Sequence, residues 1–265
     1  MSWTDAFKYT KGLAARHGVA SADSNAQRVD QGLPFGARIG GVVKLQMSPL
    51  IRANANGSLI TIPAAPDNLI KAISRVKLNL DGKLHRFYLN LGDDDADQES
   101  FLQVFSNPQG EIAELLYCTR LTRIIPETEE EQDAYTGAAG AGLGEKNYSL
   151  WKEQLEGIGL EAAVLSMVFG DKESIEYTRE AGGSDHDFVE PFKGTEVRVD
   201  DVQGEHGLEQ EIYFMPYVRA VGDAQEYLLI TTEIVKSQNG DAGRRSIHVD
   251  FMIGVPVDIE RVTVQ

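Results

Sequence analysis

The chain has very little cysteine and no long apolar run. Cys118 is the only cysteine in 265 residues, which excludes an intramolecular disulfide and a zinc site built from several cysteines. No stretch approaches the roughly 18 apolar residues that a membrane-spanning helix needs. The N-terminus lacks the apolar core of a signal peptide. Together these absences predict a cytoplasmic protein.

Basic residues are also scarce. The 25 Lys and Arg residues face 41 Asp and Glu residues, so the formal net charge is -16. Because nucleic-acid binding depends on clustered basic side chains that contact phosphates, we predict no nucleic-acid partner. The hydrophobic fraction of 42% is typical of a globular protein that can bury a core.

Catalytic and cofactor motifs are missing as well. None of the five histidines has a metal-ligand spacing such as HExxH. The glycine-rich run 137–144 resembles a phosphate loop, but Gly144-Glu145-Lys146 interposes an acid where a Walker loop requires Gly-Lys. Ser184 beside Asp185-His186 has no strand–turn–helix setting. We therefore expect no cofactor and favour a protein without catalytic activity.

The segments that are present are mostly short strands. The fold class that they predict is β-dominated α+β, built from antiparallel meanders with a few short helices. The densest run, 84–121, predicts three successive strands, and three more are expected near the C-terminus. The other predicted strands are 42–46, 58–62, 76–80, 175–179 and 196–199, and the pair Asn56-Gly57 predicts a hairpin turn before 58–62. Residues 68–75 are predicted to be a short helical or irregular entry to the strand 76–80. The segments 127–134 and 148–155 are predicted helices, and 160–169 suits either type.

The predicted organisation has an N-terminal arm, 1–32, and a globular region, 33–265. The glycine-rich run 137–144 divides the globular region into the candidate sub-lobes 33–136 and 145–265. Residues 2–16 suit an amphipathic helix with Trp3 and Phe7 on one face, which makes these two residues candidates for contact with a partner. The helix could dock on a partner protein, touch a membrane surface peripherally, or pack on its own domain.

An acidic loop interrupts the strand-rich run. Its candidate metal ligands are Asp93, Asp95 and Asp97, since carboxylate oxygens suit hard cations. The EF-hand pattern fails, however, because Gln98 and Val104 stand where it needs glycine and glutamate. A solvated turn is the simpler interpretation, so we predict no metal.

Several runs resemble a known family. They are LPFGARIGGVVKL, LHRFYLN, FLQVF, EIAELLYC, EYLLITTE and RSIHVDFMIGVPVD, between residues 33 and 258. They resemble the YjfK-like bacterial proteins, a family of unknown function. The resemblance implies a gene cluster with a phage-shock-A-like coiled-coil protein, a small membrane protein and an ATP-grasp-type ligase. It therefore implies an accessory role in envelope or membrane stress.

Three functional hypotheses follow. The first is a non-catalytic adaptor that binds a phage-shock-A-like partner. The second is an enzyme or small-ligand-binding protein with a polar site built from Arg38, His85, Arg86 and the acidic loop. A concave pocket in which polar side chains converge would favour it. The third is a homo-oligomer formed through an exposed edge strand, for which the aromatic run 212–217 with Pro216 is the candidate.

Overall fold

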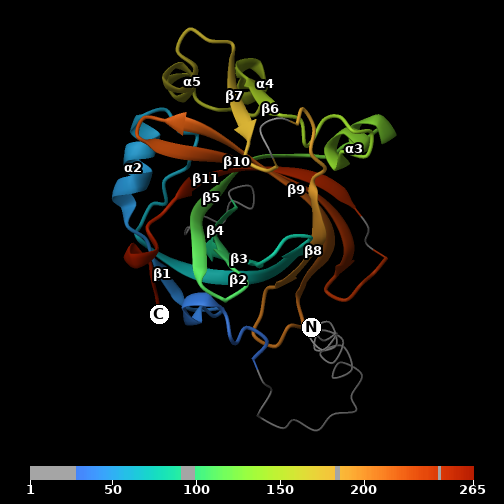
Figure 1. Ribbon diagram of the computed structural model, residues 1–265. Helices are drawn as coiled ribbons and strands as arrows, with labels where there is room; N and C mark the ends of the chain where they lie inside the picture. The colour runs from blue at the N-terminus through green and yellow to red at the C-terminus, as the bar shows by residue number, and fades with distance from the viewer. Residues whose placement is uncertain (1–27, 91–98, 183–185, 244–245) are drawn as a thin grey trace.

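Eight antiparallel strands close into a barrel in this computed structural model, which describes residues 28–90, 99–182, 186–243 and 246–265. Figure 1 looks along the barrel. Around the ring, each strand pairs with the next, and the last pairs with the first. In ring order the strands are β2 (Asp67–Leu78), β3 (Lys83–Asn90), β4 (Ser100–Ser106), β5 (Ile112–Ile124), β11 (Ile247–Pro256), β10 (Ala224–Gln238), β9 (Gly207–Val221) and β8 (Phe192–Val199).

Closure of the ring depends on β8. This strand pairs with β9 along its length, from Phe192 opposite Phe214 to Val199 opposite Gly207. Its other edge pairs with the second half of β2. An eight-stranded barrel has an interior just wide enough to be filled by side chains or to hold one small ligand.

Short elements surround the barrel. The strands β1 (Val42–Lys44) and β12 (Thr263–Val264) extend the sheet beyond β2, while β6 (Asn147–Trp151) and β7 (Ser174–Arg179) extend it beyond β9. The helices α2 (Met47–Ala55), α3 (Glu129–Thr136), α4 (Lys152–Gly157) and α5 (Ala162–Phe169) lie outside the ring in Figure 1. Two 3₁₀ turns, η1 (Pro34–Gly36) and η2 (Ile259–Arg261), complete the described elements.

Both faces of most barrel strands are buried. On β3, Phe87 and Leu89 point outward into the largest hydrophobic core, which also contains Leu50 of α2 and Phe169 of α5. Alternate residues point inward, and Tyr88 belongs to a separate interior core. The strands β3, β10 and β11 are therefore buried along most of their length, and their polar side chains are buried with the apolar ones.

The β-dominated fold with antiparallel pairing and few short helices is confirmed, as are the three strands of 84–121 and the three near the C-terminus. The predicted helix at 127–134 corresponds to α3. Its N-terminus is a capping box in which Glu131 N donates to Thr128 Oγ1 and Thr128 N donates to Glu131 Oε2, both at 3.2 Å.

Three local predictions were wrong. Residues 58–62 form no strand, because Asn56-Gly57 ends helix α2 and does not turn a hairpin. Residues 68–75 belong to the single long strand β2. Residues 148–155 divide between β6 and α4, so only their second half is helical.

The glycine-rich run 137–144 is held firmly in place. Gly137 ends α3 with a left-handed φ of 72°. At the other end, Gly144 N donates to the Tyr217 hydroxyl at 2.9 Å, and its carbonyl accepts from Arg179. Strands that precede and follow this run belong to the same closed ring.

Two predictions concern parts of the chain outside the described residues. The amphipathic helix with Trp3 and Phe7 lies in 1–27, and Asp93, Asp95 and Asp97 lie in 91–98. In the part of the chain that the structure describes, no helix combines the length and the apolar character needed to cross a membrane.

Candidate functional site

The interior of the barrel contains two cavities with opposite character. One is polar and has a volume of about 100 Å³. The other is largely apolar and has a volume of about 290 Å³. Along β3, Leu84 lines the apolar cavity, whereas Arg86 and Tyr88 line the polar one. The two cavities therefore occupy opposite ends of the interior.

Every barrel strand except β2 contributes to the wall of the polar cavity. Arg86 lies near its centre and is 2% exposed. Its Nη1 lies 2.9 Å from Glu196 Oε2 and 3.7 Å from Glu233 Oε1. The remaining lining residues are Tyr88, Glu99, Phe101, Arg123, Arg198, Leu208, Gln210, Thr231, Glu233, His248, Asp250 and Met252.

Acidic and basic groups of this cavity neutralise one another. Arg123 donates to both oxygens of Asp250, each at 2.6 Å. Arg198 lies 2.9 Å from Glu99 and stacks over the Tyr88 ring at 4.1 Å. The Arg123–Asp250 pair is a bidentate, charge-assisted contact, and the Arg198–Tyr88 contact is a stacked one. Arginine favours both types at buried positions.

The shifts in pKa follow from burial and from these pairs. Burial disfavours the charged Arg86 guanidinium, but the carboxylates of Glu196 and Glu233 outweigh it and raise its pKa. Burial likewise disfavours the Glu99 carboxylate, and Arg198 outweighs it and lowers that pKa. For Glu233, burial dominates over the hydrogen bond from His248, and the pKa is raised.

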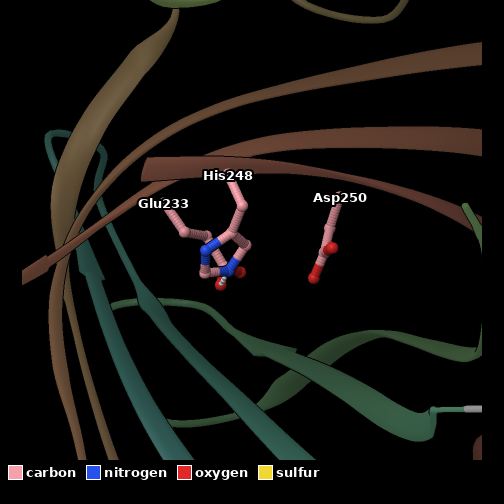
Figure 2. Close-up of side chains that lie close together, drawn as sticks. All are labelled: Glu233, His248 and Asp250. Carbon is pink, nitrogen blue, oxygen red and sulfur yellow. Dashed lines mark hydrogen bonds and ion pairs between the residues drawn. The ribbon is translucent and has the colours of Figure 1, made fainter. Parts of the chain in front are cut away.

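Three residues of the polar cavity could in principle hold a divalent cation. Figure 2 shows Glu233 and His248 facing each other, with Asp250 to one side. One ligand atom from each lies within 4.8 Å of the other two, and one imidazole with two carboxylates suits a first-row metal. His248 Nε2 already lies 2.8 Å from Glu233 Oε2. A metal would also compete for Asp250 with the two hydrogen bonds that Arg123 donates to it. The present geometry is that of ion pairs.

One acceptor in the polar cavity has no partner. Gln210 is 2% exposed, and its Nε2 donates to Glu196 at 3.2 Å. Its Oε1 accepts no hydrogen bond from any described residue. The cavity can therefore accept a hydrogen-bond donor at Gln210, within a volume of about 100 Å³.

The apolar cavity has a different composition. Leucine and phenylalanine side chains form most of its surface, and Leu80, which is partly exposed, lies at its rim. Its polar groups are Gln103, Glu114, Glu180 and the Tyr227 hydroxyl. The remaining lining residues are Leu78, Leu84, Phe105, Leu116, Phe192, Phe214, Pro216 and Leu229.

An apolar layer separates the two cavities. It is the interior core, which includes Phe101, Leu116 and Met252. Cys118 is fully buried in the same layer, and burial raises the pKa of its thiol, so that it remains an unreactive thiol. A hydrogen bond crosses the layer, from Arg86 Nε to Gln103 Oε1 at 3.3 Å.

The three predicted ligand-binding residues occupy three environments. Arg86 lines the polar cavity. His85, the next residue along β3, points to the outer face beside Arg75, and burial lowers its pKa to about 4. Arg38 is exposed before β1. Their role in binding a ligand stays a prediction.

Apart from Glu99, the last residue of the predicted acidic loop 93–99, sequence reasoning did not identify the acidic residues of either cavity. Glu233 and His248 are adjacent only because β10 pairs with β11. Glu114 lies on β5, whereas Glu180 directly follows the last residue of β7. The available signal was an acidic residue at an inward position of an otherwise apolar strand, as at Glu233 in the run EYLLITTE. Without the strand register, an inward acidic residue does not reveal which side chain on the neighbouring strand lies beside it.

Comparison with known proteins identifies one relationship. A family model described as a protein of unknown function, DUF2491, matches residues 21–153, half of the chain. The search among curated proteins and the search among solved structures find no match. The matched segment contains Arg86 and Glu114, whereas the resemblance to YjfK-like proteins in particular stays a prediction. The chain belongs to the DUF2491 family.

Proposed function

We propose that this protein is a non-catalytic binder of a small molecule, which it holds in the apolar cavity of the barrel. The observation that carries the proposal is that cavity itself, with a volume of about 290 Å³ inside a closed ring of strands. Small-molecule sites are concave, mostly apolar and equipped with a few convergent polar groups, with volumes of about 300–1,000 Å³. The apolar cavity meets that description at its lower size limit.

Size and charge favour the apolar cavity over the polar one. The polar cavity has about one third of the volume, and its charged walls are already paired with each other. A ligand there would have to replace strong ion pairs. In the apolar cavity, a ligand gains the burial of its apolar surface, about 25 cal/mol per Å².

A neutral probe tests this proposal. We expect 1-hexanol to bind the full chain saturably in titration calorimetry and in ligand-observed NMR. Replacing Leu84, which is 6% exposed and lines the apolar cavity, with phenylalanine should fill part of the volume and weaken binding about tenfold. The matched control is Leu69→Phe, because Leu69 is 44% exposed and lies outside the cavity.

Two results would contradict the proposal. One is the absence of saturable hexanol binding to a folded wild-type chain. The other is equal affinity of the wild type and Leu84→Phe, with circular dichroism showing that both are folded. Either result would mean that the cavity does not accept an apolar molecule.

The adaptor role is a second candidate, and one surface feature favours it. The outer elements expose large apolar side chains, including Ile51 on α2, Trp151 at the end of β6 and Met167 on α5. Each of these side chains is a candidate contact point for a partner protein. The partner implied by the family resemblance is a phage-shock-A-like coiled-coil protein, and residues 1–20 are the candidate docking segment.

A binding experiment separates the two candidates. The full chain and a chain lacking residues 1–20 would each be mixed with the purified coiled-coil protein encoded beside it. Co-elution of the full chain alone would support docking through the N-terminal segment. Independent elution of both would contradict the adaptor role and leave the ligand-binding proposal standing.

A further inference from the structure

The charge inside the apolar cavity is unbalanced. The half-buried Glu114 and the exposed Glu180 contribute two carboxyl groups to its lining, and among the described lining residues none is Lys, Arg or His. The polar cavity at the other end shows the contrast, since its Arg86, Arg123 and Arg198 each have a carboxylate within 3 Å. The apolar cavity therefore lacks the counter-charge that the polar cavity supplies for itself.

The acidic groups of this cavity act on one another. Burial, and then the nearby Glu180, raise the pKa of the half-buried Glu114 carboxyl, and a hydrogen bond from Tyr227 opposes this shift. Burial and both carboxylates raise the pKa of the Tyr227 phenol, so that it remains a neutral donor. A cation placed between Glu114 and Glu180 would relieve their repulsion.

Aromatic side chains reinforce the preference for a cation. Phe105, Phe192 and Phe214 line the same cavity. The face of an aromatic ring attracts a cation within about 6 Å of its centroid, and the attraction is stronger where water is excluded. The cavity thus combines an apolar body with aromatic faces and two carboxylates at its polar positions.

We infer that the ligand of the apolar cavity is a small amphipathic cation, an apolar body with a positively charged nitrogen that binds between Glu114 and Glu180. The inference rests on the proposed function, because it names the ligand class of the same cavity. An anionic ligand, such as a fatty acid carboxylate, would meet two like charges there. A neutral ligand would leave the negative charge of the two carboxyl groups uncompensated.

Three probes of equal length separate shape from charge. They are hexylammonium, 1-hexanol and hexanoate, each titrated into the full chain at pH 7.5 by calorimetry. We expect hexylammonium to bind about tenfold more tightly than hexanol, because a charge-assisted hydrogen bond to a carboxylate is stronger than the neutral hydrogen bond of a hydroxyl group. Hexanoate should bind most weakly.

Substitutions assign the preference to the two carboxylates. Glu114→Gln and the double variant Glu114→Gln/Glu180→Gln should reduce the advantage of hexylammonium over hexanol to less than threefold, with hexanol affinity nearly unchanged. The matched control is Glu176→Gln, because Glu176 is exposed on β7 and lies outside the cavity lining. It should preserve the full ratio.

The pH dependence gives an independent readout. Since the pKa of Glu114 is raised, more of this carboxyl ionises as the pH rises from 5 to 7.5. Hexylammonium affinity should rise over that range in the wild type and stay flat in Glu114→Gln. Hexanol affinity should stay flat in both.

The outcomes are distinguishable. Equal binding of hexylammonium and hexanol in the wild type, with both weakened by Leu84→Phe, would overturn the inference and leave the proposed function intact. A tenfold ratio that persists in the double variant would also overturn it, since the cation would then bind elsewhere. Failure of all three probes to bind would overturn both.

Discussion

Glu226 is the most heavily hydrogen-bonded carboxylate on the outer wall of the barrel. It is fully buried, and it accepts from Leu59 N and Tyr177 Oη at 2.6 Å and from Arg219 Nε at 2.7 Å. The Ser58 hydroxyl also donates to it. A single side chain therefore fixes the irregular segment after α2, strand β7 and strand β9 to β10.

Glu226→Gln should destabilise the fold. The amide removes the negative charge and leaves the largely buried Arg219 guanidinium without its counter-charge, which costs about 2–4 kcal/mol in the free energy of unfolding. Urea denaturation followed by circular dichroism measures this change.

The control for Glu226 is an exposed ion pair. Glu211 lies 2.9 Å from Lys193 and 3.0 Å from Lys236, both well exposed. Glu211→Gln should cost less than about 1 kcal/mol, since exposed pairs contribute little. Equal losses in the two variants would contradict the role given to Glu226.

Glu233 makes the stability of the fold depend on pH. Because its pKa in the folded protein is raised above the ordinary value of 4.5, the folded state binds more protons than the unfolded state above that pH. Its contribution is present at low pH and is lost as the pH rises through the folded pKa. Glu233→Gln should therefore flatten the decline in unfolding free energy between pH 5 and pH 8.

Urea denaturation at pH 5, 6.5 and 8 tests the effect of Glu233. The difference between the wild type and Glu233→Gln should grow in favour of the variant as the pH rises. Glu176→Gln, a change at an exposed carboxylate, should follow the wild type. Parallel curves for the wild type and Glu233→Gln would rule out this effect.

At the scale of elements, the seam between β8 and β2 closes the ring. A Cβ atom built at Gly194 would lie 2.1 Å from Lys77 O and 2.9 Å from Leu78 Cα. The two strands thus approach more closely than any side chain at this position allows. Glycine in a strand often marks such a close backbone approach.

Gly194→Ala should weaken this seam. We expect a loss of about 1–3 kcal/mol in unfolding free energy, the usual range for overpacking. Gly157→Ala at the end of α4 is the matched control, since no atom lies within 4 Å of the added Cβ and its φ is not left-handed. If both variants unfold at the same urea concentration, the seam is not as tight as described.

Local patterns predicted most elements but not their partners. The strand-forming runs of β9, β10 and β11 and the acidic N-terminus of α3 are encoded within a few neighbouring residues, so they were readable from the sequence. The strand that closes the ring was readable only in part, as 196–199. The Asn56-Gly57 pair was misread because the same dipeptide ends a helix as readily as it turns a hairpin.

The same reasoning applies to the candidate site. Arg86 could be named because a charged residue in an apolar strand is conspicuous. Its separation from His85 follows from strand alternation, but which of the two points inward depends on the register of the whole ring. Glu114 and Glu180 come together only through the packing of β7 at the end of the barrel, for which the sequence contains no local signal.

At the scale of the whole molecule, the ring joins distant parts of the chain. The strands β2 to β5 precede the glycine-rich run 137–144, and β8 to β11 follow it. Two seams, β5 with β11 and β2 with β8, connect these groups. Neither group can complete the interior core without the other.

The protein should therefore unfold in a single cooperative transition. Calorimetric and van't Hoff enthalpies of thermal unfolding should agree, as they do for two-state proteins. The fluorescence of Trp151, on the outer β6, and the far-ultraviolet circular dichroism should change together. Two separate transitions, one for each side of 137–144, would contradict this prediction.

The apolar layer across the middle of the barrel has a consequence for exchange. A molecule that enters past Leu80 meets a floor formed by Leu116 and its neighbours, and beyond that floor lie paired charges. Among the described residues, the apolar cavity therefore ends at this layer, so a molecule that enters past Leu80 would leave by the same side. The rate at which a bound molecule leaves would then depend on the side chains at this rim, Leu80 among them.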